Sequence, residues 1–416
     1  MYEIIKDTCY IWAKEMRSVI SDEGVLIFFV VVPLLYPLLY SWAYNNEVVR
    51  DVPVAVVDLS NSNTSRQFIR RCDASPEVKV AYRCSSIDEA RRLVGHQVAR
   101  GIVYFPSDFE KNLGRGEQSK ISLFCDMSMM LTYKAIYLTT MNVAQDMNAE
   151  IQVAQANPAT EREGEILTKP LDFEEVQMFN TPAGYGNFIL PGVLVLILQQ
   201  TLLLGIGLGA GTARENNRYQ DLVPVSRHYK GFFRIVFGKA LCYFMVFAVM
   251  CAYITLVVPR IFSFTSIPQP GVLFALMLPY LLACIFFGMF FSCIIRYREN
   301  VILLVVFLSL PFLFLAGLSW PQTSIPAALQ GIAHLVPSTF GIRGFVRVSV
   351  MGATLDDVRY EYVWLWVLTA VYFLATCAVY RYQLRSARRH AVERVTSIKE
   401  AAVRQKAINI QKEANT

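Results

Sequence analysis

A short polar island interrupts the apolar part of this sequence: Arg214-Glu215-Asn216-Asn217-Arg218-Tyr219-Gln220-Asp221-Leu222-Val223-Pro224-Val225-Ser226. It lies between two long apolar runs, and the segment 211–240 around it carries 6 Lys and Arg residues. A short basic loop that joins two membrane spans faces the cytoplasm. Mixed charges followed by Pro224 indicate a short helix lying under the bilayer. A solvated loop, held inside by its charge alone, is the alternative.

The composition is that of a membrane protein. Of the 416 residues 54% are hydrophobic, whereas soluble domains are about 45–50% apolar and lack repeated apolar runs near 20 residues. We therefore expect an α-helical integral membrane protein with six transmembrane helices and no cleaved signal peptide. The apolar runs lie at 25–44, 188–210, 232–258, 271–295, 301–318 and 363–380.

The basic residues of the short connecting segments set the expected orientation. Residues 1–24 carry 3 Lys and Arg residues, 296–300 carry 2 and 381–416 carry 9, whereas 259–270 carry only Arg260. The excess of positive charge marks the cytoplasmic side, so both termini are expected inside and residues 45–187 outside the cytoplasm. The basic excess is therefore explained by topology, and we do not interpret it as nucleic-acid binding.

Residues 45–187 have the pattern of a soluble α/β domain inserted between the first two spans. Apolar runs typical of strands occur at 52–58, 78–82, 101–106 and 121–126, and they alternate with helical segments at 61–71, 87–96 and 128–157. An extended return to the membrane is expected at 174–179. The domain carries three cysteines, Cys72, Cys84 and Cys125, which allow at most one disulfide. A Cys72–Cys84 pair is left open.

The two ends of the chain are expected on the cytoplasmic side. Residues 4–20 place apolar side chains on one helical face and Glu15 with the basic residues elsewhere, so 1–24 should hold a helix lying in the membrane interface. Lys239, at the start of the third span, is expected to extend to the inner surface. The basic tail 383–416 is either a helical extension of the last span or a solvated helix that binds anionic lipid.

Within the helical region 188–382, three features stand out. Gln199, Gln200 and Thr201 lie near the middle of the second span, where polar groups face protein or water. They predict hydrogen bonds between helices, with contact to a transported substrate as the alternative. Gly205 and Gly209 form a GxxxG spacing, as do residues 207 and 211, and such spacings let another helix approach closely.

The segment 319–338 is too short to span a bilayer and contains Pro321, Pro326 and Pro337. It predicts re-entrant half-helices that enter from the outer face. An amphipathic helix on the outer surface is the alternative.

Motifs for catalysis are not found. The sequence has no GxxxxGK[ST] phosphate loop, no HExxH and no GxSxG, so we name no catalytic residue, metal ligand or cofactor of this chain. The spans carry no carboxylates away from their ends, and no inverted repeat is visible, which argues against a proton-coupled or secondary transporter. A transport subunit of this kind needs an energy source in another chain.

The order of these features resembles the ABC-2 type permeases, the membrane subunits of type V ABC exporters. The polar island resembles their cytoplasmic signature, although Ala213 replaces its first Glu and Asn217-Arg218 replace its Gly-Thr. The resemblance covers nearly the whole chain. Its other motifs are Phe188-Ile189-Leu190-Pro191-Gly192, Leu315-Ala316-Gly317-Leu318-Ser319-Trp320-Pro321, Val54-Ala55-Val56-Val57-Asp58 and Ile102-Val103-Tyr104-Phe105-Pro106-Ser107-Asp108-Phe109.

The resemblance implies an inner-membrane permease that exports a drug, lipid or peptide, and that forms a homodimer or pairs with a sibling permease. ATP and Mg would then be bound by a separate ATPase subunit under the membrane. The loop 211–230 would be the coupling helix, the three prolines of 319–338 would shape an outer gate, and a periplasmic adaptor is a further implied partner. The expected coupling residues are Arg214, Glu215, Asn216, Asp221 and Pro224.

A second hypothesis comes from another class of protein. The chain would be a membrane scaffold or secretion component that transports nothing itself, and its external domain would bind a partner protein. A scaffold needs no ATPase, so co-purification with an ATPase separates the two hypotheses.

Overall fold

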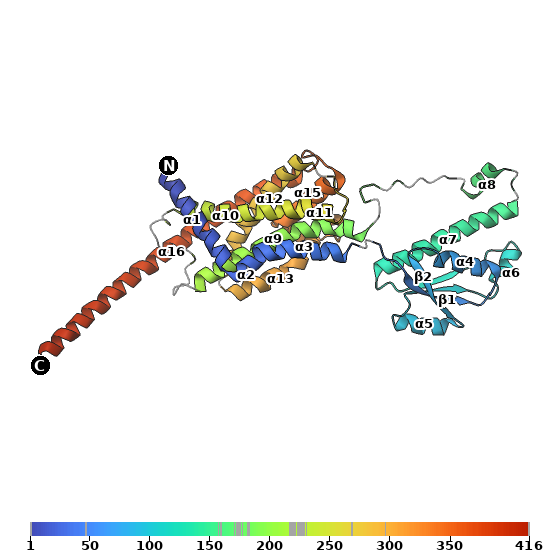
Figure 1. Ribbon diagram of the computed structural model, residues 1–416, viewed down its shortest axis with the longest axis horizontal. Helices are drawn as coiled ribbons and strands as arrows, with labels where there is room; N and C mark the ends of the chain where they lie inside the picture. The colour runs from blue at the N-terminus through green and yellow to red at the C-terminus, as the bar shows by residue number, and fades with distance from the viewer. Residues whose placement is uncertain are drawn as a thin grey trace. The chain divides into compact units, whose positions relative to one another are not determined.

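The computed structural model describes residues 2–45, 48–156, 158, 160–169, 171, 176, 178–180, 184–215, 222, 229, 231–267, 269–295 and 297–414. The chain forms two compact units, Met1–Asn45 with Phe179–Thr416, and Asn46–Met178. We call the first the membrane unit and the second the α/β unit (Figure 1). Half of the expected return segment 174–179 lies outside the described residues.

The membrane unit is helical throughout its described elements. Helix α16 continues without a break from its apolar part into the basic tail. The elements are α1 (Tyr2–Ser21), α2 (Glu23–Leu26), the π-helical turn η1 (Ile27–Val31), α3 (Val32–Ala43), α9 (Tyr185–Glu215), α10 (Phe232–Ala252), the π-helical turn η2 (Tyr253–Val257), α11 (Val258–Ile261), α12 (Pro270–Ile294), α13 (Arg298–Leu315), the 3-10 turn η3 (Gln322–Ser324), α14 (Ala327–Ala333), α15 (Pro337–Met351) and α16 (Arg359–Ala414).

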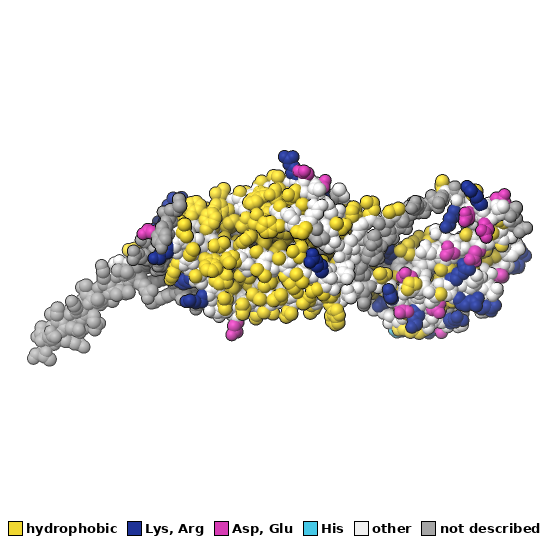
Figure 2. Space-filling model, turned by 45° about the horizontal axis from the view of Figure 1, so that its top comes forward, with side chains coloured by type: hydrophobic (Ala, Val, Ile, Leu, Met, Phe, Trp, Pro, Cys, Tyr) yellow, Lys and Arg dark blue, Asp and Glu magenta, His cyan; other side chains and the backbone are white. Residues whose placement is uncertain are grey.

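Among the described residues, six helices are long and apolar enough to cross a membrane, the same number as the spans expected from the sequence. Figure 2 shows apolar side chains covering much of the visible face of the membrane unit, whereas both signs of charge are spread over the α/β unit. Apolar side chains on an outer surface are what a bilayer solvates. The spans are Glu23–Ala43, Tyr185–Glu215, Phe232–Ile261, Pro270–Ile294, Arg298–Leu315 and Arg359–His390.

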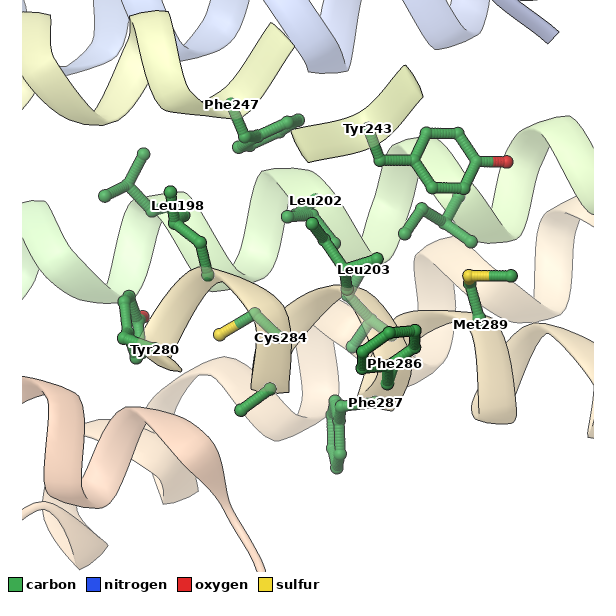
Figure 3. Close-up of a cluster of buried hydrophobic side chains, with 14 of the residues drawn as sticks. Leu198, Leu202, Leu203, Tyr243, Phe247, Tyr280, Cys284, Phe286, Phe287 and Met289 are labelled. Atoms are coloured by element: carbon green, nitrogen blue, oxygen red, sulfur yellow. The ribbon is translucent and has the colours of Figure 1, made fainter. Parts of the chain in front are cut away.

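Helix α9 is the core helix of the membrane unit. In Figure 3 its residues Leu198, Leu202 and Leu203 lie between side chains of α10 and α12, and all three are buried. Helix α9 is buried on more than one side, which explains why its sequence is apolar all round rather than amphipathic.

Glycines on α9 allow two neighbours to approach from different sides. The ring of Phe29 in η1 occupies the space that a Cβ at Gly205 would need, and Val25 lies 3.6 Å from the corresponding point at Gly209. In the same way, Val301 and Arg298 of α13 occupy the space that a Cβ at Gly207 and at Gly211 would need. One row of small residues therefore packs against the first span and the other against α13.

The α/β unit is a four-stranded sheet with helices on both faces. The strand order is β2-β1-β3-β4, in which β1 is parallel to β2 and β3, and β4 is antiparallel to β3. The strands lie where the sequence predicts them, and α8 was not predicted. The elements are β1 (Val52–Asp58), α4 (Asn63–Asp73), β2 (Val78–Cys84), α5 (Ile87–Gly95), β3 (Gly101–Phe105), α6 (Phe109–Gly114), β4 (Ser122–Cys125), α7 (Met130–Ala156) and α8 (Glu161–Thr168).

The two faces of the sheet separate the cysteines that the sequence left open as a pair. Cys72 is buried with the cluster that packs α4 and α7 on one face. Cys84 packs with the cluster that includes Ala90 of α5 on the other face. All nine cysteines lie among the described residues and are free thiols. Burial raises the pKa of the Cys72 thiol to about 12, so it stays protonated and unreactive at neutral pH.

Candidate coupling site

Helix α1 is held against α10 by two ion pairs. Asp7 accepts a hydrogen bond from Arg234, and Glu15 accepts one from Lys239 Nζ at 2.8 Å and another from the Tyr243 hydroxyl. Ile11 lies between the two acids on the same face of α1 and is completely buried. The face of α1 that packs on the bundle is therefore partly acidic, because residues four apart lie one above the other on a helix.

This packing corrects two expectations from the sequence. Glu15 was expected away from the packed apolar face of residues 4–20, but it lies against α10. Lys239 is buried and bonded to Glu15, so it does not extend to the surface as predicted. Periodicity separates apolar from polar positions, and it does not reveal that a polar position has a partner of opposite charge.

Asp22 joins three helices at one point. Its side chain caps α2 by accepting hydrogen bonds from the backbone N–H groups of Gly24 at 3.1 Å and Val25 at 3.3 Å. Thr212 near the end of α9 donates to it at 2.6 Å, and Arg298 at the start of α13 donates at 3.1 Å. A single carboxylate therefore fixes the first span to the ends of α9 and α13.

The electrostatics of Asp22 favour its charged form. Its partial burial would raise the pKa of the carboxyl group, but the Thr212 hydroxyl, the capping N–H groups and the Arg298 guanidinium outweigh that effect and lower the pKa below its usual value. The carboxylate is therefore ionised at neutral pH and bonds to Arg298 as a charged pair.

Arg214 is the next-to-last residue of α9 and is only 3% exposed. Its guanidinium donates to the backbone carbonyls of Cys293, at 2.7 Å, and Ile295, at the C-terminal end of α12. The last carbonyls of a helix carry partial negative charge and lack partners within the helix, so a buried cation stabilises this end of α12. The side chain of Arg214 thus connects the base of the polar island to α12.

The next residue differs from Arg214. Glu215 ends α9 and is exposed. Asn216, Asp221 and Pro224 lie outside the described residues. Two described residues of the same loop, Leu222 and Tyr229, are buried in the core cluster of the membrane unit, and Lys14 Nζ of α1 lies 5.3 Å from the centroid of the Tyr229 ring. The loop is therefore anchored to α1 at one of its described points.

Sequence reasoning missed Asp22, Thr212 and Arg298 as partners. Asp22 stands three residues before the apolar run that begins at Val25, which is a signal for a helix N-cap. Its bonds to residues 190 and 276 positions away leave no pattern in a single sequence.

The polar residues of the second span have local and inter-helix partners. Gln199 Oε1 accepts a hydrogen bond of 2.7 Å from the backbone N–H of Ser338 in the first turn of α15. Thr201 donates to Ile197 O within its own helix. Both polar atoms of the Gln200 amide are buried without a protein partner. The Gln199 amide oxygen therefore caps α15. Contact with a substrate stays an untested alternative for all three residues.

Each proline of the segment 319–338 stands at the start of a helical element. Pro321 precedes the turn η3, Pro326 precedes α14 and Pro337 is the first residue of α15. Proline suits a first helical position because the missing N–H group has no partner there. Pro321 and Pro326 are exposed, whereas Pro337 is buried. Helices α14 and α15 span 7 and 15 residues, which is too short to cross a bilayer alone.

Arg343 of α15 bonds to the C-terminal end of α13, much as Arg214 bonds to that of α12. Its Nε donates to Ala316 O at 2.9 Å.

Among the described residues, no group of three or more His, Cys, Asp or Glu side chains is placed to hold a metal ion.

These features define a multi-pass helical membrane protein whose spans are joined at one end by a polar network around a loop. The chain belongs to the ABC-2 family of transporter proteins, because the model of that family matches residues 24–378. The match runs from the capped start of the first span into the last one, and it includes the α/β unit.

Individual relatives agree with this assignment. The chain is 23% identical over 380 residues to the "Probable multidrug ABC transporter permease YbhR" of Escherichia coli (strain K12), with 88% of this chain and 96% of that protein covered. It is 23% identical over 385 residues to the "Inner membrane transport permease YhhJ" of the same strain, with 89% and 95% covered. It is 21% identical over 370 residues to the "Linearmycin resistance permease protein LnrN" of Bacillus subtilis (strain 168), with 81% and 89% covered.

Proposed function

We propose that the chain is the permease subunit of an ABC exporter and that a separate ATPase subunit drives it by docking at the loop 211–230. The observation that carries this proposal is the position of the loop. Its first residues continue α9, the core helix, and Asp22 and Arg214 connect this end of α9 to the first span, α12 and α13. A force applied to the loop would reach four spans through bonded contacts rather than through one flexible connection.

The positive charge of the short segments supports a cytoplasmic position for this end of the membrane unit. Both termini are then cytoplasmic and residues 45–187 extracytoplasmic. ATP and Mg are bound by the ATPase subunit, and this chain needs no cofactor of its own. The protein works as a homodimer or with a sibling permease, and a periplasmic adaptor is a further candidate partner in a cell with two membranes.

The two neighbouring residues at the end of α9 have different roles in this proposal. Glu215 is exposed and contacts the ATPase subunit directly, together with Asn216, Asp221 and Pro224. Arg214 is buried and acts by positioning, because it fixes the end of α12 to the base of the loop. The prolines at 321, 326 and 337 shape the outer gate by setting where each short helix begins.

The cargo is proposed only as a class. The names of the relatives refer to multiple drugs and to linearmycin resistance. They support export of an amphipathic small molecule, lipid or peptide.

The proposal is tested with the full chain, reconstituted in lipid with a phosphate-loop ATPase subunit from the same genome. The charge reversal Glu215→Arg should lower permease-stimulated ATP hydrolysis about tenfold, because like charges at an interface cost on the order of 1–3 kcal/mol. Glu299→Arg in the first turn of α13 makes the same change in net charge and is the matched control, expected to stay within about twofold. Full stimulation by Glu215→Arg would refute the assignment of the loop.

The scaffold hypothesis remains the second candidate, because the α/β unit is a complete folded unit with its own core. It predicts that the chain co-purifies with a partner of the α/β unit and with no ATPase. Stable capture of an ATPase subunit by the full chain would exclude it.

A further inference from the structure

An exposed apolar tip lies at the start of α7 in the α/β unit. It comprises Met127, Met129, Met130 and Leu131, all of which are exposed, with Met130 at 70%. We call residues 127–131 the methionine tip. Single exposed apolar residues are common, but four within five residues of a folded soluble unit mark a surface that contacts something apolar.

The register of the strands places the methionine tip at one end of the sheet. Arg100 N donates to Pro53 O at 2.8 Å, and Asp126 N donates to Arg100 O at 2.9 Å, so Asp126 lies level with the second residue of β1. The methionine tip follows directly, at the end of the sheet where strand β1 begins. Helix α7 runs from this end across one face of the sheet (Figure 1).

The chain enters the α/β unit at the same end of the sheet, because β1 is the first strand after the first span. Seven residues, and so eight steps along the chain, separate Tyr44, the C-cap of α3, from Val52, the first residue of β1. Such a connection spans at most about 28 Å when fully extended. The end of the sheet that carries the methionine tip is therefore tethered close to the bilayer surface where the first span ends. The short connection limits this distance on whichever side of the bilayer the α/β unit lies.

The charges around the tip also suit a lipid surface. The carboxylate before it, Asp126, is paired with Arg100 at 3.3 Å. The first charged residue after it is Lys134, which is exposed one turn further along α7. An apolar tip followed by a lysine matches the order of acyl chains and anionic headgroups that it would meet. Methionine side chains are flexible and adapt to an irregular apolar environment.

We propose that the methionine tip inserts into the bilayer surface and holds the α/β unit against the membrane. A helix or loop that lies in the interface buries its apolar side chains about 5–10 Å deep. In this proposal α7 enters the bilayer by its first turn. Met141, which is also exposed on α7, lies 11 residues beyond Met130, about 16 Å further along the helix axis, and in that orientation it stays out of the lipid.

The test uses the full chain in vesicles of phosphatidylcholine and phosphatidylglycerol that contain a trace of fluorescent phospholipid. The photoreactive residue p-benzoylphenylalanine replaces Met130 in one variant and Met141 in the matched control. We expect at least about five times more fluorescent lipid on the protein from position 130 than from position 141 after illumination. The same probe at Met127 gives an independent second measurement with the same expected excess.

Three results would overturn the proposal. Equal lipid labelling at positions 130 and 141 would show that the tip is no closer to the bilayer than the rest of α7. A dimer-sized adduct in place of lipid labelling would assign the tip to a second copy of the chain. Illumination that yields no lipid adduct at either position 127 or position 130 would show that the tip stays in water or contacts protein.

Discussion

Asp22 and Thr212 are 190 residues apart in the sequence, and the Thr212 hydroxyl donates a hydrogen bond of 2.6 Å to the Asp22 carboxylate. The bond joins the start of the first span to the end of the second across the insertion of the whole α/β unit. It also adjoins the base of the polar loop, so the stability of this end of the membrane unit should depend on a single carboxylate.

Replacing Asp22 with alanine removes a helix cap and two inter-helix bonds. We expect Asp22→Ala to destabilise the full chain by at least about 2.5 kcal/mol, since a cap contributes about 1 kcal/mol and even one hydrogen bond to a charged group about 1.5–3 kcal/mol. The shift is measured as loss of thermal stability in detergent. Asp88→Ala, at an acid on the exposed surface of α5, is the control and should change stability by less than about 0.5 kcal/mol. Equal stability of the two variants would show that Asp22 does not stabilise this end of the membrane unit.

The contribution of Asp22 should depend on pH. The pKa of its carboxyl group is lowered in the folded chain, so the charge stabilises the fold above the usual carboxyl pKa. That stabilisation is lost as pH falls through the lowered value. The difference in melting temperature between the native chain and Asp22→Asn should therefore be full at pH 7 and shrink below about pH 4. A difference that is the same at pH 7 and at pH 3 would show that the charge does not contribute.

The buried pair Glu15–Lys239 should be sensitive to the loss of one partner. Lys239→Met leaves the Glu15 carboxylate buried without its cation, and breaking a buried pair costs about 3–5 kcal/mol. The double variant Glu15→Gln/Lys239→Met should recover part of that loss in a thermal unfolding assay. The exposed pair Asp88–Arg91, at 3.9 Å, is the comparison, and its disruption should cost at most about 1 kcal/mol. Lack of recovery in the double variant would mean that packing, and not charge, explains the effect.

The two glycines of the 205/209 row should respond differently to one added methyl group. A Cβ at Gly205 collides with the ring of Phe29, whereas at Gly209 it meets Val25 at an ordinary 3.6 Å. Gly205→Ala should therefore destabilise by about 1–3 kcal/mol, and Gly209→Ala should be close to neutral or slightly stabilising. Phe29→Leu combined with Gly205→Ala should restore part of the loss in the same assay. Equal effects at the two positions would contradict the packing of the first span on α9.

Part of this structure could be predicted from the sequence, for physical reasons that individual residues make clear. Runs such as 232–258 must be helical spans, because a bilayer leaves the backbone no other way to satisfy its polar groups. Alternation of strands and helices in residues 52–157 predicted the sheet, and Ser86 and Glu89 make hydrogen bonds typical of a capped helix start at the expected helix 87–96.

The polar network was not predictable. Glu15 and Asp22 reach partners more than 180 residues away, and one sequence contains no record of which acid meets which base. Arg214 was expected as a coupling residue, but no pattern in the sequence predicted that its side chain would be buried against α12. Asn216, Asp221 and Pro224 lie outside the described residues, so their roles stay predictions.

The central claim is that an ATPase subunit contacts the loop that follows α9. The most direct measurement places p-benzoylphenylalanine at Glu215 in the full chain, co-expressed with the ATPase subunit, and at Asp88 of the α/β unit as control. Illumination of intact membranes should join the ATPase subunit covalently to the chain from position 215 and not from position 88. An adduct from position 88 with none from position 215 would contradict the account. So would reaction of a cysteine at position 215 with an impermeant reagent added outside intact cells.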